Sequence, residues 1–553
     1  MNQWAATLAA AIVVGALVVV RRIIDPSMPA ARSYQVLQLC LLVVAGVGRA
    51  LMGWRPPPGE EVRRWRWPAA VPWCVVLAAA ILPYLHSLRI GFLSDDFGLA
   101  AAAHEASGPL EAMRSAAFVT FYRPVSMLVW WAGEHLWAGA PAGYHVLNLL
   151  LHAGNSLLVY ALGRRLIGSS YGGFLAAVLF AVHPLHVEPV AWVCCGSDLL
   201  CVGFSLVSLL WLEAHLARGA GRGGWLVLSG SLAAFLLALL SKEAALALPV
   251  VVLLRLALHG PRPRWRRAAG TVGGYGLVLV CCVAWRYFAF GGLVTYPTSF
   301  SFWNTAFPSA PLRQMGDFLF PVHRPLFLEG LGLWLWCAAM LPMAAAVLWW
   351  IRGLVYVPAW RLWLWTGYVF AAAIPVWTLS ATTSGDMSGS RFAYLPTIGL
   401  AWLFGDLCAG RGIGWRRSGG VAAAVVIGAA ALTIWYVVPW RQGGVVAQEI
   451  VAAGERVLGD LSESGEVRML YVQGLPEMEF GVPVFRNCYP QALSLATGGR
   501  VGTTVGAMVV SATNARGVIH PEVLASRALA PGEHVVAWRP ETGEMEVVRR
   551  GGE

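Results

Sequence analysis

The chain alternates between long apolar runs and short loops that carry most of its arginines. A helix of about 17 to 25 mostly apolar residues can cross a bilayer, and on this basis the pattern predicts about 13 spans. We expect spans near 4–20, 34–53, 68–88, 143–163, 171–187, 225–241, 243–259, 270–290, 331–351, 361–380, 392–409 and 419–439, with one more that ends at Arg218. Residues 125–137 combine three Trp with Glu134 and His135, so we expect them to lie in the interface rather than to span.

The pattern changes after Trp440. Residues 467–472 alternate like a strand, and 534–538 and 545–548 read as a hairpin around a turn at 540–543. We therefore predict an all-α polytopic membrane protein with a small soluble α+β domain at its C-terminus. The expected divisions are an N-terminal helix pair with a basic loop (1–67), a transmembrane region (68–440) and the soluble domain (441–553).

Composition agrees with a membrane protein. The 553 residues are 58% hydrophobic and only 12% charged, whereas soluble domains carry about 25% charged residues. The net charge of +11 comes from arginines in short loops between apolar runs, which is the pattern of cytoplasmic loops and not of a nucleic-acid surface. The ten Cys show no metal-ligand spacing, and the apolar run at the N-terminus lacks a signal-peptidase site, so we interpret it as a retained helix.

The basic loops predict the orientation of the chain. If the loop 55–66 is cytoplasmic, the segment after the span 68–88 lies on the non-cytoplasmic side, and an odd number of spans places 441–553 there too. Arg21, Arg22 and Arg32 disagree with this scheme, so the orientation of the first helix pair is the weakest part of the topology. We expect a multi-pass protein of the bacterial inner membrane, with the C-terminal domain periplasmic or extracellular.

Unusual polar residues fall at the predicted outer ends of the spans. They are Asp95, Asp96, Arg123, His183, His186, Glu188, Asp198, Lys242, Glu243, Asp386 and Arg391. Ionisable groups close to hydrocarbon are costly and usually functional. Their placement on one side predicts a single outward-facing site, although two adjacent acids after a span can also be a solvated loop.

Several of these residues belong to recognisable motifs. The ten residues from His183 to Trp192 read HPLHVEPVAW, which resembles the HPxHVExVAW signature of the transmembrane-and-TPR O-mannosyltransferases and their bacterial relatives. Flanking pieces agree in order and spacing: FYRP at 121–124, GYHVLNLLLH at 143–152, SDLL at 197–200, LSKE at 240–243 and SRFAYLPTIG at 390–399. The resemblance covers roughly residues 68–440 and is specific as a set.

The resemblance implies a GT-C glycosyltransferase, a superfamily that includes the lipid A aminoarabinose transferase. Its members resemble one another in taking a sugar from a polyprenyl phosphate on the non-cytoplasmic face. The resemblance also implies that the acceptor displaces the lipid phosphate directly, with inversion of configuration at the sugar. This chain departs from the animal members because it lacks 34-residue TPR repeats and has a different tail. The acceptor, which could be a protein, a glycan or a lipid, is therefore not carried over.

Sugar transfer from a lipid phosphate needs a base for the acceptor proton and cations for the leaving phosphate. The resemblance assigns the base to the acid of the first loop, and we favour Asp95, with Asp96 orienting the acceptor or a metal. Arg123, Lys242 and Arg391 are candidates to bind the donor phosphate, since Arg grips phosphate bidentately and Lys acts as a point charge. Each could instead be an interfacial cation that pairs with lipid headgroups.

The His-Glu string leaves two interpretations. His183, His186 and Glu188 could hold a divalent metal, or they could make structural or acceptor-orienting hydrogen bonds, as intramembrane His and Glu usually do. Asp198 could accept a hydrogen bond inside the bundle. His145, Asn148 and His152 are spaced three and four apart on one predicted helix face, which indicates helix–helix hydrogen bonds.

Two other classes of protein compete with this reading. A transporter of lipid-linked saccharides would typically show internal repeats and broken helices at mid-membrane, whereas the sequence shows no repeat and places its charges at the outer edge. A polymer ligase would share the lipid-phosphate donor and differ in its acceptor.

Overall fold

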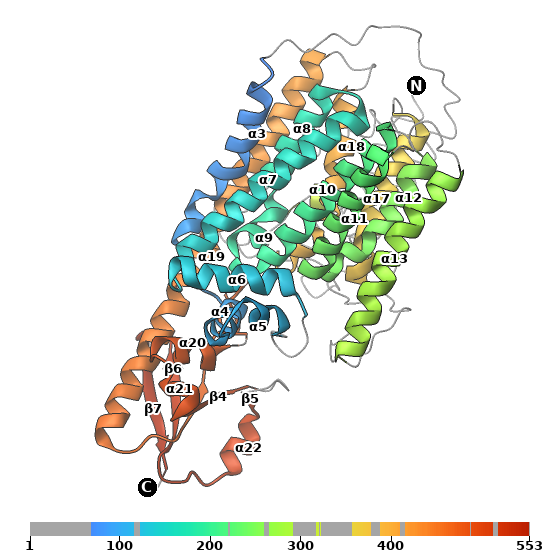
Figure 1. Ribbon diagram of the computed structural model, residues 1–553. Helices are drawn as coiled ribbons and strands as arrows, with labels where there is room; N and C mark the ends of the chain where they lie inside the picture. The colour runs from blue at the N-terminus through green and yellow to red at the C-terminus, as the bar shows by residue number, and fades with distance from the viewer. Residues whose placement is uncertain are drawn as a thin grey trace. The chain divides into compact units, whose positions relative to one another are not determined.

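The computed structural model describes residues 68–115, 122–218, 222–258, 265–290, 317–319, 321, 357–377, 387–409, 415–479, 481–486, 488–511 and 518–551 (Figure 1). The predicted spans near 4–20, 34–53 and 331–351, together with Asp386, lie outside these residues. The chain divides into two compact units. Unit 1 takes the described residues up to Pro83, Leu149–Pro189 and Asp198–Trp435, and unit 2 takes Tyr84–Asn148, Val190–Ser197 and the residues from Tyr436 onward.

Long apolar helices dominate the described residues. By length and composition, six helical segments can cross a membrane: Val71–Arg89, Pro141–Ile167, Val193–Arg218, Gly223–Ser241, Arg267–Ala289 and Gly419–Ser464. A bent pair, Ser170–Ala181 with Pro184–Ala191, makes a seventh if it counts as one span. The prediction of a polytopic, mainly helical protein is therefore confirmed, and the count of about 13 spans stays a prediction.

The helices of unit 1 begin with α3 (Val71–Ile81), whose helical path continues as the 3-10 segment η1 (Leu82–Arg89). They go on with α7 (Pro141–Ile167), α8 (Ser170–Ala181), η2 (Pro184–His186), α9 (Val187–Ala191), α10 (Gly196–Arg218), α11 (Arg222–Ser241), η4 (Glu243–Ala247), α12 (Leu248–Leu258), α13 (Trp265–Phe290), α17 (Ala359–Trp377), η5 (Ser390–Ala393), α18 (Thr397–Ala409) and α19 (Trp415–Ser464). Several of these start or end in unit 2.

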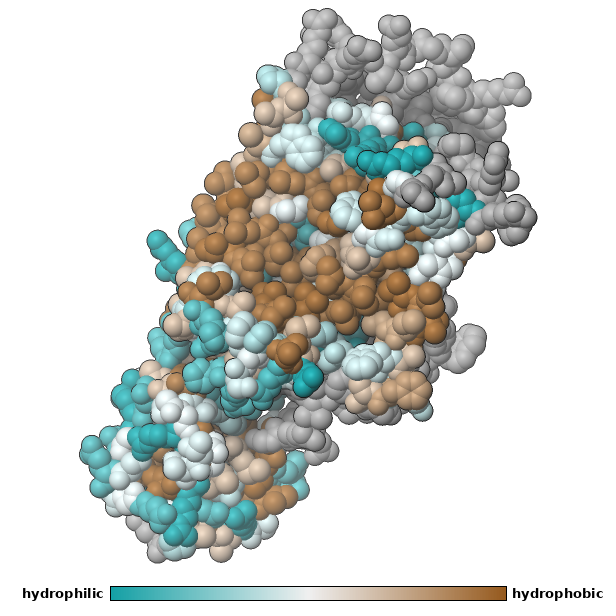
Figure 2. Space-filling model, in the orientation of Figure 1, coloured by the Kyte–Doolittle hydropathy of each residue, from teal (hydrophilic) through white to brown (hydrophobic). Residues whose placement is uncertain are grey.

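Small residues bring two of these helices together. A Cβ on Gly405 of α18 would lie 2.1 Å from the carbonyl oxygen of Gly172 on α8, so only glycine allows this backbone approach. Such contacts replace the hydrophobic effect as the source of helix association in a bilayer. On the face drawn in Figure 2, hydrophobic side chains gather over the helices of unit 1, as a lipid-facing surface requires. Leu253, Leu277 and Phe288 are examples of exposed large hydrophobic residues among those that the structure describes.

Prolines divide three of the predicted spans. The span expected at 171–187 bends by 53° between α8 and the η2–α9 segment that begins at Pro184. The span expected at 243–259 is η4 followed by the 11-residue α12, and Pro249 lies in the first turn of α12. Similarly, the span expected at 392–409 is η5 followed by α18, which starts directly after Pro396. Proline is favoured in a first helical turn and disrupts a helix interior, so each helix restarts within one residue of the proline.

Unit 2 combines short helices with a mixed sheet. Its helical segments are α4 (Asp95–Glu105), α5 (Pro109–Arg114), α6 (Pro124–Trp137), η3 (Val193–Cys195), α20 (Tyr489–Ala496), α21 (Arg500–Thr503) and α22 (Pro521–Ser526). The 14-residue α6 coincides with the segment expected in the interface and is not among the helices long enough to span. We call residues 465–551, which contain the sheet, the C-terminal sheet domain.

The five-stranded sheet has the order β5-β4-β1-β6-β7. Its strands are β1 (Met469–Gln473), β4 (Gly506–Val510), β5 (Val518–Ile519), β6 (Glu533–Arg539) and β7 (Glu544–Arg550). The predicted hairpin is confirmed as the antiparallel pair β6–β7, while β1 pairs in parallel with both β4 and β6. A small hairpin, β2 (Met478–Glu479) with β3 (Val482–Pro483), follows β1. The 50-residue α19 runs past Trp440, so the change of hydropathy there does not end the helix.

Candidate functional site

The two acids of unit 2 occupy the first turn of α4, where the helix dipole favours carboxylates. Asp96 is buried; its Oδ1 accepts a hydrogen bond from the Cys194 N–H at 2.7 Å, and its Oδ2 accepts one from the Leu93 N–H at 3.0 Å. Burial raises the pKa of Asp96 well above its ordinary value, the two N–H bonds oppose this rise, and the nearby Asp95 adds to it. Asp96 therefore fastens two loops of unit 2 to each other.

Asp95 has a different environment. Its side chain is 22% exposed, and its Oδ2 lies 4.0 Å from Nη2 of Arg486, which comes from the C-terminal sheet domain. The sequence barely distinguished the two acids, but their surroundings differ clearly: Asp96 is enclosed by backbone donors, and Asp95 remains accessible. A general base must reach the proton that it removes, so accessibility favours Asp95.

The backbone just before the acids is strained. Ser94 has φ 42° and ψ −108°, a conformation that residues other than glycine rarely adopt. Such a residue costs on the order of 1–3 kcal/mol and persists only where its surroundings fix it. Here Ser94 is fully buried, and its N–H donates to the carbonyl oxygen of Val484 at 2.9 Å.

The end of the His-Glu motif supports the acid pair within unit 2. The indole N–H of Trp192 donates to the Leu93 carbonyl at 3.3 Å, and the Asn148 side chain donates to the Trp192 carbonyl at 3.2 Å. His145 Nε2 lies 3.0 Å from the Ile90 carbonyl oxygen. Helix–helix hydrogen bonds were expected of His145 and Asn148. Ile90 and Trp192 lie between helical segments, so these contacts join α7 to loops instead, and one of these loops leads into α4. Arg123 lies at the N-cap position of α6 and is partly buried.

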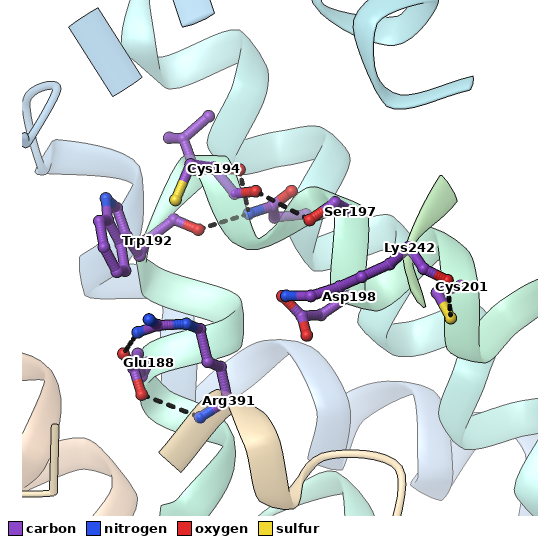
Figure 3. A network of polar contacts seen from close by, with 10 residues as sticks. Glu188, Trp192, Cys194, Ser197, Asp198, Cys201, Lys242 and Arg391 are labelled. Atoms are coloured by element: carbon purple, nitrogen blue, oxygen red, sulfur yellow. Dashed lines mark hydrogen bonds and ion pairs between the residues drawn. The ribbon is translucent and has the colours of Figure 1, made fainter. Parts of the chain in front are cut away.

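Unit 1 contains two of the three cations predicted to bind the donor, Lys242 and Arg391. Arg391 of η5 forms an ion pair with Glu188 of α9 through Nη1 and Oε1, and its backbone N–H donates to Glu188 Oε2 at 2.8 Å (Figure 3). The Ser390 hydroxyl donates to the same Oε2 at 3.2 Å. The Glu188 side chain is 3% exposed, so the motif residue Glu188 fixes both the main chain and the side chain of Arg391.

A second ion pair joins Lys242 to Asp198. Lys242 Nζ donates to Asp198 Oδ2 at 2.5 Å, and both residues are buried (Figure 3). Lys242 Nζ also lies 5.8 Å from the centroid of the Phe392 ring, and Arg391 Cζ lies 4.6 Å from the same centroid. Lys242 and Arg391, which are far apart in sequence, therefore converge on one aromatic ring.

The histidines of the motif make hydrogen bonds. His183 Nε2 donates to the Phe318 carbonyl at 2.9 Å while its Nδ1 accepts from the Leu185 N–H at 3.3 Å, and His186 Nδ1 lies 2.7 Å from the Phe180 carbonyl oxygen. Within the described ranges, no group of three or more His, Cys, Asp or Glu side chains is placed to hold a metal ion. The contacts of His183 and His186 are hydrogen bonds to backbone groups, as the second of the two interpretations of the His-Glu string expected. His152, the third residue of the predicted face, lies 2.9 Å from the Ala181 carbonyl oxygen and 2.8 Å from the Tyr394 hydroxyl.

Two residues were missed by the sequence reasoning. Phe392 directly follows Arg391 within the recognised motif, so its place beside the cations could have been noticed. Arg486 could not, because it lies outside the motifs and only the fold brings it to Asp95. Asp198 was expected to accept a hydrogen bond, and its donor is Lys242.

Comparison with known proteins finds relatives named protein O-mannosyl-transferases. No protein-family model matches the sequence. The chain is similar to the protein O-mannosyl-transferase TMTC4 of Homo sapiens (38% identity, 22% of this chain and 19% of the relative). It is also similar to two further proteins named protein O-mannosyl-transferases. Tmtc2 of Drosophila melanogaster has 32% identity over 42% of this chain and 25% of the relative, and F38B6.6 of Caenorhabditis elegans has 32% identity over 25% of this chain and 22% of the relative. The chain thus spans a quarter or less of the length of each of these relatives, and they confirm the resemblance found in the motifs.

One similar solved structure is that of ArnT from Cupriavidus metallidurans bound to undecaprenyl phosphate. The sequence identity is 16% and the TM-score 0.42, and the similarity covers 86% of this chain and 94% of that chain. The same protein in the apo state gives a TM-score of 0.40.

Proposed function

We propose that this protein is a membrane glycosyltransferase that moves a sugar from a polyprenyl phosphate to an acceptor hydroxyl on the non-cytoplasmic face of the bacterial inner membrane. The observation that carries the proposal is the convergence of Lys242 and Arg391 on the Phe392 ring. Two cations near one aromatic ring, on apolar helices, suit a lipid-bound phosphate, and both belong to motifs that resemble the O-mannosyltransferases.

Asp95 acts as the general base in this proposal. The acceptor oxygen attacks the anomeric carbon of the sugar, and its proton passes to the Asp95 carboxylate. The bond between the anomeric carbon and the phosphate oxygen breaks, and its electron pair leaves with the polyprenyl phosphate, so the configuration inverts. Because the acceptor loses its proton as the new bond forms, a positioned base contributes about 10² to 10⁴-fold to the rate.

Lys242 and Arg391 hold the donor phosphate, with Arg123 as a third candidate. Negative charge grows on the leaving phosphate in the transition state, so fixed cations stabilise that state more than the bound donor. A guanidinium has five N–H donors in a rigid fork, which lets Arg391 bind phosphate while Glu188 holds it. His183, His186 and Glu188 keep the surrounding segments, and with them the acceptor, in position.

The assay for this function uses the purified chain in nanodiscs with membranes of the producing cell as the source of acceptor. We expect labelled mannose, the sugar that the relatives' names point to, to move from a polyprenyl monophosphate into material insoluble in organic solvent. A nucleotide-linked mannose should not serve as donor. Transfer from the nucleotide sugar alone would overturn the proposed donor. Movement of an intact lipid-linked saccharide across vesicles without transfer would instead support the transporter, and transfer of whole polymers would support the ligase.

The orientation of the chain has its own test. Reporters inserted at residue 262 and fused after the last residue, 553, should lie on opposite sides of the membrane, because 262 belongs to the most basic loop and the C-terminal domain follows the last span. We expect the C-terminal reporter outside and the loop reporter inside. Reporters on the same side would contradict the proposed face.

A further inference from the structure

The C-terminal sheet domain contacts the acid pair directly, within unit 2. The chain leaves β1 at Gln473, turns at Gly474 with φ 76°, forms the small β2–β3 hairpin and then reaches Val484, Phe485 and Arg486 before α20. At Gly474 the positive φ suits only glycine without strain. This path returns the chain from the sheet to the start of α4.

Consecutive residues of that segment contact the residues around the acids. Val484 accepts the hydrogen bond from the strained Ser94, the Phe485 ring stacks on the Phe97 ring at 5.6 Å and 17°, and Arg486 approaches Asp95 at 4.0 Å. α20 packs against α4 beside them, and the Phe485 ring also meets the Tyr489 ring of α20 edge-on at 5.1 Å.

The two parts of this contact differ in burial. Val484, Phe485, Ser94 and Phe97 are buried, so they form a packed core that fixes the position of α4 relative to the segment. Arg486 and Asp95 lie at its edge, with side chains 43% and 22% exposed. An ion pair as exposed and as long as this one adds about 0–1 kcal/mol of stability at most. Stability is therefore a poor explanation for an arginine aimed at the accessible acid.

We infer that Arg486 is a positioning residue, which holds the Asp95 carboxylate in the orientation that receives the acceptor proton. This rests on the proposed function of Asp95. It gives the C-terminal sheet domain a place beside the proposed catalytic base. At 4.0 Å the guanidinium is beyond hydrogen-bond distance, so in this structure Arg486 acts on the Asp95 carboxylate as a nearby positive charge. The attraction favours the carboxylate orientation that faces the guanidinium and does not require the acid to be buried.

Kinetics of full-length variants in nanodiscs test the role. We expect Arg486→Gln to lower kcat about 10 to 100-fold, because small displacements of a catalytic group cost this much, and to leave KM for the polyprenyl-phosphate sugar unchanged. Arg486→Lys should regain part of the loss because the charge returns without the fork. The matched control is Arg468→Gln, at the other end of β1, where an exposed arginine pairs with Glu466 and no effect is expected.

A double variant distinguishes positioning from a separate structural effect. If Arg486 acts through Asp95, Asp95→Asn combined with Arg486→Gln is no slower than Asp95→Asn alone, since effects of residues that act as a unit do not multiply. Losses that multiply, or wild-type kcat in Arg486→Gln, would overturn the inference. The inference would also be overturned if Arg486→Gln and Arg486→Lys lost kcat and their melting temperatures fell equally, because the loss of activity would then follow from a loss of stability.

A measurement without turnover keeps this inference separate from the proposed function. Coupling of carboxylates to an amine by a carbodiimide, read by mass spectrometry, should label Asp95 faster in Arg486→Gln than in the wild type, with buried Asp96 as the internal control. Equal rates would overturn the Arg486–Asp95 contact even in an active enzyme. A wild type that transfers no sugar would overturn the proposed function, and the labelling would still test the contact.

Discussion

Asp95→Asn is expected to lower turnover about 10² to 10⁴-fold while leaving the affinity for a polyprenyl phosphate unchanged. The substitution keeps the size of the side chain and removes its capacity to take a proton. Because Asp95 is partly exposed and lies at the edge of its packed surroundings, the melting temperature should change little. The measurements are kcat with the labelled donor, donor binding and thermal unfolding in nanodiscs. Glu105→Gln, at the exposed end of the same helix, is the control.

Substitution of the neighbouring Asp96 should instead lower the stability of the protein. Asp96→Asn replaces one acceptor oxygen by an amide N–H₂ that faces a backbone N–H of Leu93 or Cys194, so one buried donor loses its partner. This costs about 1–3 kcal/mol and lowers the melting temperature. Activity retained in both Asp95→Asn and Asp96→Asn would remove the acid pair from the mechanism.

Removal of Lys242 should weaken the binding of the donor phosphate. A charged hydrogen bond contributes about 1.5–3 kcal/mol, so Lys242→Met is expected to weaken the binding of a polyprenyl-phosphate analogue about 10 to 100-fold. Arg391→Ala should act similarly, and Arg391→Lys should restore little because the fork is lost. The single Lys242→Met variant also leaves buried Asp198 unpaired, which costs about 3–5 kcal/mol of stability.

A double variant separates binding from stability. Lys242→Met with Asp198→Asn removes the charge from both partners, so stability should largely return while phosphate binding stays weak. The matched control is Arg255→Met with Glu213→Gln, a partly buried ion pair near the other end of α10, about 22 Å along the helix from Asp198. Wild-type affinity in both Lys242→Met and Arg391→Ala would show that other residues hold the phosphate.

Local patterns in the sequence predicted the local elements. The apolar runs gave α7, α11 and α13 within a few residues, and the alternation of 534–548 gave the β6–β7 hairpin. Prolines inside apolar runs, such as Pro184 and Pro249, were counted as parts of continuous spans, although a proline ends the hydrogen-bond ladder of the preceding helix. Hydropathy indicates whether a helix lies in lipid or in water and does not show where the helix ends. It therefore could not predict that α19 continues beyond its apolar part to Ser464.

The candidate site was predicted as a set of residues but not as pairs. Glu188 and Arg391 are 203 positions apart, and Asp198 and Lys242 are 44 apart, so no helical spacing connects them. Their motifs marked them as unusual, and only the fold shows which acid holds which cation. Arg486 carried no signal at all, since an arginine in a soluble loop is ordinary until the fold places it beside a catalytic candidate.

The Asp198–Lys242 ion pair also constrains the biogenesis of the protein. Asp198 lies in the first turn of α10 and Lys242 directly follows α11, so the two charges belong to consecutive helices. Both charges lie at helix ends, where a lone charge costs less than at the centre of a span but is still unfavourable close to hydrocarbon, and this cost falls when the charge meets its partner. We therefore expect the two helices to enter the bilayer most favourably as one hairpin in which the lysine already meets the aspartate.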